Sequence, residues 1–223
     1  MKTVGLICEG VSELNVLETI LTRFLGESYV INPIQPETRV ENGVRIQEGG
    51  GGWSRVISLC NSVKRKEILE HNDYLVIQLD SDACEHYGVD SLDANHKKKS
   101  SEVLLKDIIQ NLESKIFDDG NDEDHSRIVF AICIDETECW LLPLVYSDKH
   151  RCADHNCLFL LNDALRKKNM TTVSKDDKNS PNSRKAYRAI LRMIRKKADV
   201  EMISKENVGF KQFVQDLKSL TID

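Results

Sequence analysis

Two carboxylates one residue apart, Asp80 and Asp82, end an apolar stretch over residues 74–79. Such a run, followed by turn-forming residues, predicts a strand that is buried on both faces of a parallel sheet. The two acids would then lie at its carboxyl end, where open α/β sheets place their ligands. Because carboxylates this close repel each other, we expect a hard divalent cation, Mg²⁺ or Mn²⁺, to bind them. The alternative is that Asp80 caps a turn and Asp82 is solvated.

Acidic residues follow two further predicted strands. Glu9 comes after an apolar segment at residues 3–8, and the acidic stretch Asp135 to Glu138 comes after another at 127–134. The carboxyl ends of parallel strands meet at one edge of a sheet, so these acids should gather there with Asp80. One acidic strand end could be accidental, whereas three favour a cation site.

The rest of the sequence predicts helices around this sheet. Apolar residues recur at helical spacing over 14–25, 53–63 and 101–116, and again from Phe210 to Leu217. Residues 29–34 are a candidate edge strand, because Pro33 cannot donate to a ladder. Residues 40–52 are expected to form a loop, and 117–126 an acidic loop without a metal. The predicted fold class is therefore α/β, a mostly parallel sheet flanked by helices.

The formal charge of −5 hides an asymmetry. Residues 149–197 contain 14 Lys and Arg against 4 Asp and Glu, whereas the rest of the chain has 17 against 32. A predicted helix from Ser183 to Lys197 concentrates this positive charge, which suits binding to a phosphate backbone. A solvated helix face is the alternative. The candidate nucleic-acid-binding residues are Arg184, Lys185, Arg188, Arg192 and Arg195.

Seven cysteines, an odd number with several in apolar runs, favour reduced thiols over a disulfide framework. His150, Cys152, His155 and Cys157 could bind zinc, but their spacing is short, and a polar turn is the alternative. No run is long enough to span a bilayer, and the chain starts without a secretory signal. We therefore expect a cytoplasmic protein without a membrane partner.

The segments Glu9-Gly10, Asp80-Ser81-Asp82 and Glu138-Cys139-Trp140-Leu141-Leu142 resemble motifs of TOPRIM domains. This fold is shared by topoisomerases, bacterial primases and OLD-type nucleases. The third segment resembles small bacterial TOPRIM-like proteins related to OLD and RloB-like sequences, many of them in phage-defence or mobile-element loci.

By position, the resemblance implies that Glu9 is a general acid/base or metal-bridging carboxylate. It implies that Asp80 and Asp82 are metal ligands, Glu138 a further ligand and Lys185 a stabiliser of phosphate charge. In the family the lysine often follows a proline-containing turn. Here Pro181 lies four residues from Lys185 rather than beside it, which departs from that pattern. Residues 1–148 would form the catalytic domain, and 149–223 a helical basic extension packed on it.

The function predicted from these residues is a divalent-metal-dependent nuclease acting on DNA or RNA. Glu9, Asp80, Asp82 and Glu138 would hold the metal, and the basic helix would hold the backbone. One alternative is a non-catalytic nucleic-acid-binding or regulatory subunit. The other is a defence component that is active only as a homo-oligomer or with a separate ATPase, since this sequence has no phosphate loop.

Overall fold

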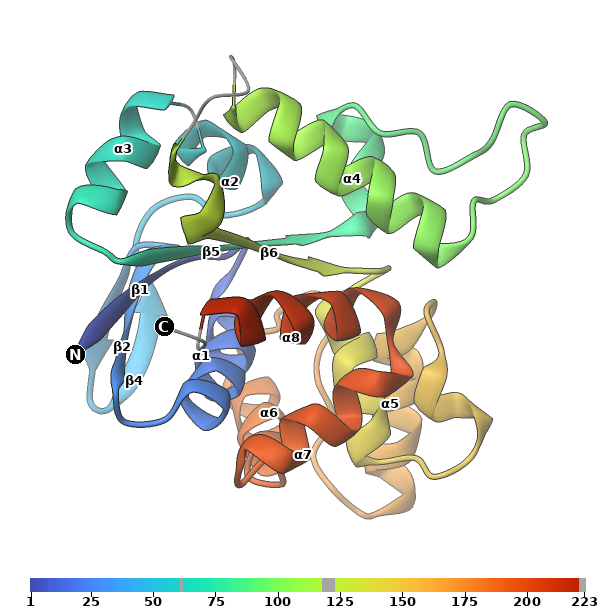
Figure 1. Cartoon of the computed structure of the whole chain (residues 1–223). Coiled ribbons are helices and arrows are strands. Elements are labelled where there is room, and N and C mark those ends of the chain that lie inside the picture. The colour runs from blue at the N-terminus through green and yellow to red at the C-terminus, as the bar shows by residue number, and fades with distance from the viewer. Residues whose placement is uncertain (61, 118–122, 221–223) are drawn as a thin grey trace.

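Four parallel strands form the central sheet of the computed structural model, which describes residues 1–60, 62–117 and 123–220 (Figure 1). The strand order is β2-β1-β5-β6, and every neighbouring pair runs parallel. The predicted α/β class with a parallel sheet is confirmed. β2 lies at an edge, as Pro33 indicated. The strands are β1 (Lys2–Ile7), β2 (Tyr29–Gln35), β5 (Tyr74–Asp80) and β6 (Ile128–Cys133).

Helices cover both faces of the sheet (Figure 1). The α2, α3 and α4 helices pack on one face, and α1 and α8 pack on the other together with the remaining helices. The α-helices are α1 (Val11–Leu25), α2 (Trp53–Leu59), α3 (Ser62–Glu70), α4 (Ser101–Ile116), α5 (Cys157–Lys167), α6 (Pro181–Leu191), α7 (Lys197–Ile203) and α8 (Val208–Leu220). The short 3₁₀ helices are η1 (Ser81–Tyr87), η2 (Glu123–Arg127), η3 (Thr137–Leu144), η4 (Lys149–Cys152) and η5 (Ser204–Glu206). None of the helices in the described ranges is long and apolar enough to cross a membrane.

The alternation of side chains along each strand divides the core in two. In β1, Val4 and Leu6 face the cluster with α1 and α8, whereas Ile7 faces the cluster with α2 and α4. The side chains on both faces of these strands are mostly apolar. β1, β5 and β6 therefore form near-continuous hydrophobic runs in the sequence. Buried side chains from residues 1–148 and from 149–220 belong to the same cluster on the α1 face.

Close packing of α8 on β6 depends on Gly209. A Cβ atom at this position would lie 2.1 Å from the carbonyl oxygen of Ile132. The helix therefore approaches the strand backbone at a distance that only glycine permits. Beyond this point Phe210 and Phe213 stack on the fully buried Trp140, with ring centroids 4.3 and 5.5 Å away.

The expected loop at 40–52 contains a two-stranded antiparallel hairpin, so that prediction is wrong for its first part. The hairpin consists of β3 (Thr38–Glu41) and β4 (Val44–Gln47). Asn42 and Gly43 form the turn with φ of 51° and 73°, the left-handed conformation that a two-residue hairpin turn requires. Of the expected acidic loop at 117–126, residues 118–122 lie outside the described residues.

The predicted helix from Ser183 to Lys197 is also wrong in its second half. α6 ends at Leu191, and α7 begins at Lys197. The carboxylate of Asp199 accepts hydrogen bonds from the backbone N–H groups of Arg195 and Lys196, 2.8 and 3.1 Å away. This interaction starts a new helix in place of continuing the first. The arginines that were expected on one helix face are consequently divided between α6 and the connection that follows it.

Candidate active site

Acidic residues gather where β1, β5 and β6 end. Asp80 is the last residue of β5, whereas Glu9 and Asp135 each lie two residues after the end of their strands, β1 and β6. The register pairs Ile7 with Ile77, and Asp80 with Cys133, so the three strands end at the same edge. The parallel topology therefore brings together acids that are far apart in the sequence.

Glu9 and Asp80 are in direct contact. The backbone N–H of Asp80 donates to Glu9 Oε1 over 2.7 Å. Oδ1 of Asp80 accepts from Gln78 Nε2 and from the hydroxyl of Thr137, each 2.8 Å away. Gln78 also accepts from the backbone N–H of Glu9 over 3.1 Å. These bonds fix both carboxylates against neighbouring strands, with Asp80 almost fully buried.

Glu138 forms the second part of the site, on η3. Its side chain is only 1% exposed, and its carboxylate accepts from Lys178 Nζ over 2.9 Å and from the Tyr187 hydroxyl. Lys178 also lies 3.3 Å from the carboxylate of Glu136 and 3.9 Å from that of Glu13. Lys178 is therefore the shared cation of three carboxylates, one from α1 and two from the start of η3.

Glu13, in the first turn of α1, belongs to the same acid cluster. Its carboxylate is buried and lies 2.8 Å from the hydroxyl of Ser12. A Cβ atom at position 10 would lie 2.5 Å from Glu13 Oε2. The glycine of the Glu9-Gly10 pair therefore leaves room for a second carboxylate. Glu13 was not among the metal ligands expected from the sequence.

The electrostatics of the cluster favour a bound cation. Burial, together with repulsion from Glu13 and Asp82, raises the pKa of Glu9 to about 7. Burial and the neighbouring carboxylates of Glu13 and Glu9 raise the pKa of Asp80 well above its usual value. Burial also raises the pKa of Glu13, although Lys178 opposes this effect. A divalent cation would offset this repulsion, and oxygen atoms are the ligands that Mg²⁺ and Mn²⁺ prefer.

Asp82 lies apart from the buried acids, on the exposed side of η1. Its backbone N–H donates to the carbonyl oxygen of Asp135 over 3.1 Å, and Asp135 N–H in turn donates to the Ser81 hydroxyl over 2.7 Å. Burial of its carboxyl group and repulsion from Asp135 raise the pKa of Asp82, against the effect of Lys178. Asp82 therefore faces the cluster from the solvent side.

Lys185 and Arg195 lie outside the acid cluster. Lys185 is exposed on α6 and forms none of the ion pairs with the carboxylates described above. Lys178, rather than Lys185, lies beside the buried acids. Its pKa is raised because the attraction of Glu138 and Glu13 outweighs the effect of burial, so it stays charged. No periodic pattern marked Lys178, since it lies in the irregular segment before α6.

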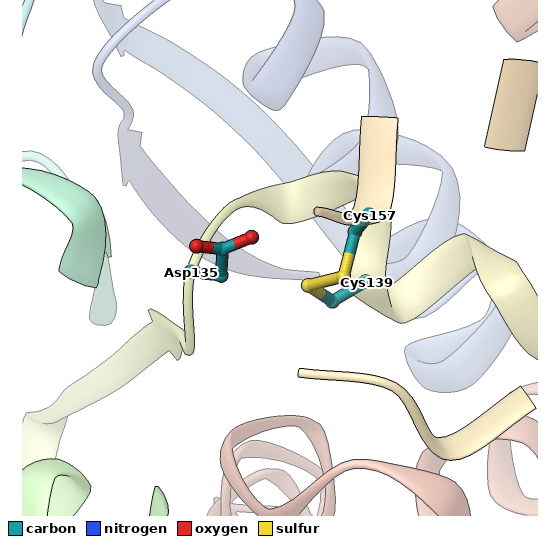
Figure 2. Close-up of side chains that lie close together, drawn as sticks. All are labelled: Asp135, Cys139 and Cys157. Carbon is teal, nitrogen blue, oxygen red and sulfur yellow. A yellow bond between two sulfur atoms is a disulfide. The ribbon is translucent and has the colours of Figure 1, made fainter. Parts of the chain in front are cut away.

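The four expected metal ligands do not converge on one point. Within the described ranges, the only group of three or more side chains with potential ligand atoms within 4.8 Å of one another is Asp135, Cys139 and Cys157 (Figure 2). The two sulfur atoms of this group are bonded to each other in a disulfide, so they are not thiolate ligands. The prediction of reduced thiols is therefore wrong for this pair, whereas the other five cysteines are free.

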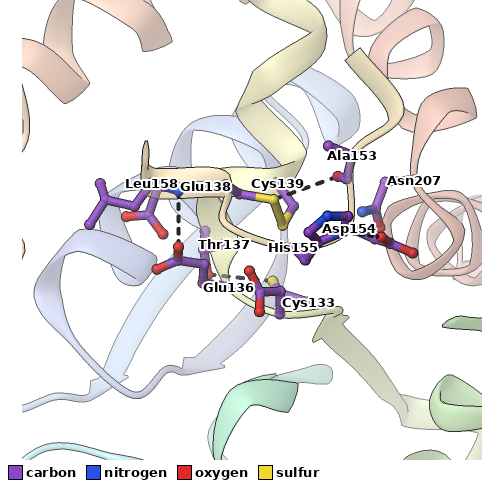
Figure 3. The surroundings of a disulfide bond; sticks show 12 residues. Cys133, Glu136, Thr137, Glu138, Cys139, Ala153, Asp154, His155, Leu158 and Asn207 are labelled. Atoms are coloured by element: carbon purple, nitrogen blue, oxygen red, sulfur yellow. Dashed lines mark hydrogen bonds and ion pairs between the residues drawn. A yellow bond between two sulfur atoms is a disulfide. The ribbon is translucent and has the colours of Figure 1, made fainter. Parts of the chain in front are cut away.

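The disulfide joins η3 to the start of α5 beside the acids. Glu136, near Cys139, accepts from the backbone N–H of Leu158 over 2.9 Å (Figure 3). The zinc interpretation of the His150 segment finds no cluster among the described residues. His150 and His155 contact Asp148 and Asp154, at 2.8 and 3.0 Å. Cys157 forms the disulfide.

A cavity of about 440 Å³ opens beside the acid cluster. Its walls are α1, the β3–β4 hairpin and α6, and Lys178 lies in its lining. Of the candidate nucleic-acid-binding residues, Arg184, Arg188 and Arg192 line it. The sequence did not indicate the hairpin wall, because those residues were expected to form a loop.

Comparisons of the chain with protein-family models, with curated proteins and with solved structures find no match. The class that the fold itself defines is an α/β protein with a four-stranded parallel sheet and acids at its carboxyl edge.

Proposed function

We propose that this chain is a divalent-metal-dependent nuclease with a TOPRIM-like fold, acting on phosphodiester bonds of DNA or RNA. The observation that carries the proposal is the carboxyl edge of the sheet. There Glu9, Glu13, Asp80 and Glu138 are held together with a single lysine partner among the described residues. The Glu9-Gly10 and Asp80-Ser81-Asp82 segments at the ends of β1 and β5 support the TOPRIM assignment.

The metal would bind to oxygen atoms of Glu9, Asp80, Asp82 and Glu138. A bound Mg²⁺ or Mn²⁺ would act as a Lewis acid on the phosphate and lower the pKa of a coordinated water. Because these four carboxylates do not converge in the metal-free protein, metal binding would require Glu9, Asp80 and Glu138 to exchange some of their present hydrogen bonds for coordination, with the exposed Asp82 turning toward them.

Two side chains have properties suited to the rest of the reaction. The pKa of Glu9 is about 7 in the metal-free protein, and a bound cation would hold this carboxylate ionised, so that it can accept a proton from a coordinated water. Lys178 is positively charged, partly exposed and adjacent to the acids, so it can stabilise negative charge on a phosphate. In this proposal Lys178 has the role that the sequence assigned to Lys185.

The test is a titration of the purified chain with Mg²⁺ and Mn²⁺ against plasmid, linear duplex, single-stranded DNA and RNA. Asp80→Asn keeps the shape of the side chain but removes a charge from the cluster. Glu27→Gln removes a charge from an exposed residue just before β2, at the opposite edge of the sheet. We expect metal-dependent cleavage by the wild type and by Glu27→Gln, and none by Asp80→Asn.

Calorimetry of metal binding separates this proposal from its alternatives. Binding of Mn²⁺ without cleavage of any substrate would refute a nuclease that works alone. It would favour a nucleic-acid-binding subunit or a component that needs an ATPase or a homo-oligomer. Cleavage that persists in Asp80→Asn would refute the assignment of the site. A cytoplasmic role in phage defence is part of the proposal, and it rests on the sequence resemblance.

A further inference from the structure

The cavity beside the acids is lined by an unusual number of arginines. Arg23 on α1, Arg45 on β4, and three residues at α6 all contribute guanidinium groups. α1 contacts both β4 and α6, so the three walls form one continuous structure. The three arginines at α6 are Arg184, Arg188 and Arg192.

Most of this charge is available to a ligand. Arg45 is paired with Glu18, 2.7 Å away, and Arg184 donates to the carbonyl oxygen of Asn179. Within the part of the chain that the structure describes, Arg23, Arg188 and Arg192 have no ion pair or hydrogen bond from their side chains. Arginines without a protein partner in a concave surface suit the planar, bidentate recognition of phosphate.

The cavity leads directly to the acid cluster. Lys178 lines the cavity and also lies 2.9 Å from Glu138. Ser12, another lining residue, is hydrogen-bonded to Glu13. Lys178 therefore connects the arginine-lined cavity with the carboxylates.

We propose that this cavity binds the sugar-phosphate backbone of single-stranded nucleic acid and guides it to the acid cluster. The cavity is concave and has a volume of about 440 Å³, so a flexible strand can enter it, whereas the phosphates of a rigid duplex lie on a convex surface. Single strands are commonly bound in basic grooves that track the backbone. The inference deepens the proposed nuclease function, because it names the substrate class of the same site.

The experiment measures binding by fluorescence anisotropy with the full chain in EDTA, which prevents metal-dependent cleavage. The probes are a 5′-fluorescein 20-nucleotide DNA strand, the same sequence as RNA, and the matching DNA duplex. The test variant is Arg23→Gln/Arg188→Gln, which removes one unpaired charge from α1 and one from α6. The matched control is Lys66→Gln/Lys106→Gln, two exposed residues of α3 and α4 on the other face of the sheet.

We expect tighter binding of the single strands than of the duplex, and about tenfold weaker single-strand binding in the arginine variant. The dependence of log Kd on log salt should fall by about 1.4, or about 0.7 for each lost phosphate contact. The lysine variant should bind like the wild type. Circular dichroism and thermal melting check that both variants are folded, and the single variant Arg192→Gln provides an independent measurement.

Equal binding of duplex and single strands, or unchanged binding by both arginine variants, would overturn the inference. These outcomes are distinct from failure of the nuclease proposal. Cavity-dependent single-strand binding without any metal-dependent cleavage would leave the inference standing and refute the nuclease. Cleavage that is unaffected in the arginine variants would leave the nuclease standing and refute the cavity as its substrate path.

Discussion

Replacement of Glu9 by glutamine should remove a pH-dependent loss of stability from the metal-free protein. In the folded chain the pKa of Glu9 is about 7, because burial and repulsion from Glu13 and Asp82 disfavour the carboxylate. In the unfolded chain its pKa is close to 4.5. Between these values the folded state binds one proton more than the unfolded state. The contribution of Glu9 to stability is therefore greatest below about pH 4.5 and is lost as the pH rises through about 7.

The magnitude follows from the two pKa values. Each unit of difference corresponds to about 1.4 kcal/mol, so ionisation of Glu9 should cost about 3 kcal/mol between pH 4.5 and pH 7.5. Glutamine carries no charge over this range and resembles the protonated acid. The unfolding free energy of Glu9→Gln minus that of the wild type should therefore rise by about 3 kcal/mol across the interval.

Urea unfolding in EDTA at several pH values measures this difference. The comparison between the two proteins cancels the contributions of other carboxyl groups, such as Asp73, whose pKa is lowered by its bonds to Thr3. Glu27→Gln is the control for loss of one exposed charge. A difference that stays constant with pH, or that falls, would refute the placement of Glu9 in a buried acid cluster. Saturating Mn²⁺ should abolish the rise, since a bound cation stabilises the ionised form.

Three further predictions concern the surroundings of the site. Lys178→Met should lower the stability of the metal-free protein by on the order of 2 kcal/mol, because it leaves buried carboxylates unpaired. Lys175→Met, at an exposed position, should leave the stability unchanged. Equal melting temperatures of the two variants would contradict this prediction. Gly209→Ala should destabilise by about 3 kcal/mol in urea unfolding, because its Cβ would lie 2.1 Å from the carbonyl oxygen of Ile132. Gly50→Ala, which meets no atom within 4 Å, should have little effect; similar losses in both would contradict the packing. The disulfide between η3 and α5 leaves five of seven cysteines free, so denatured, unreduced protein should show five thiols by Ellman titration. Seven would refute the bond.

The sheet could be predicted from the sequence because its strands are buried on both faces. In β1, β5 and β6 both sets of alternating side chains are apolar, which distinguishes these strands from amphipathic helices. The meeting of the acids follows from the parallel topology alone. The β3–β4 hairpin was missed although Asn42-Gly43 is a strong turn signal, because its short strands are largely exposed and lack an apolar pattern.

Contacts between distant segments were less accessible to sequence reasoning. Lys178 has no periodic neighbours, and only the folded chain shows that it lies beside Glu138. The partners Cys139 and Cys157 are separated by 18 residues with no pattern that selects them from the seven cysteines. The start of α7 depends on hydrogen bonds that the Asp199 carboxylate accepts from the backbone of Arg195 and Lys196, and Asp199 lies beyond the predicted helix.

The order in which these parts leave the ribosome has a consequence for biosynthesis. All the carboxylates of the cluster precede Lys178 in the chain, and α8, which covers β6, follows it. A nascent chain that has reached Glu138 already contains the acids but lacks both the compensating cation and the helix that closes that face of the sheet. The acids therefore cannot be assembled stably during early synthesis. The acid cluster would reach its final form only after Lys178 and α8 have been synthesised.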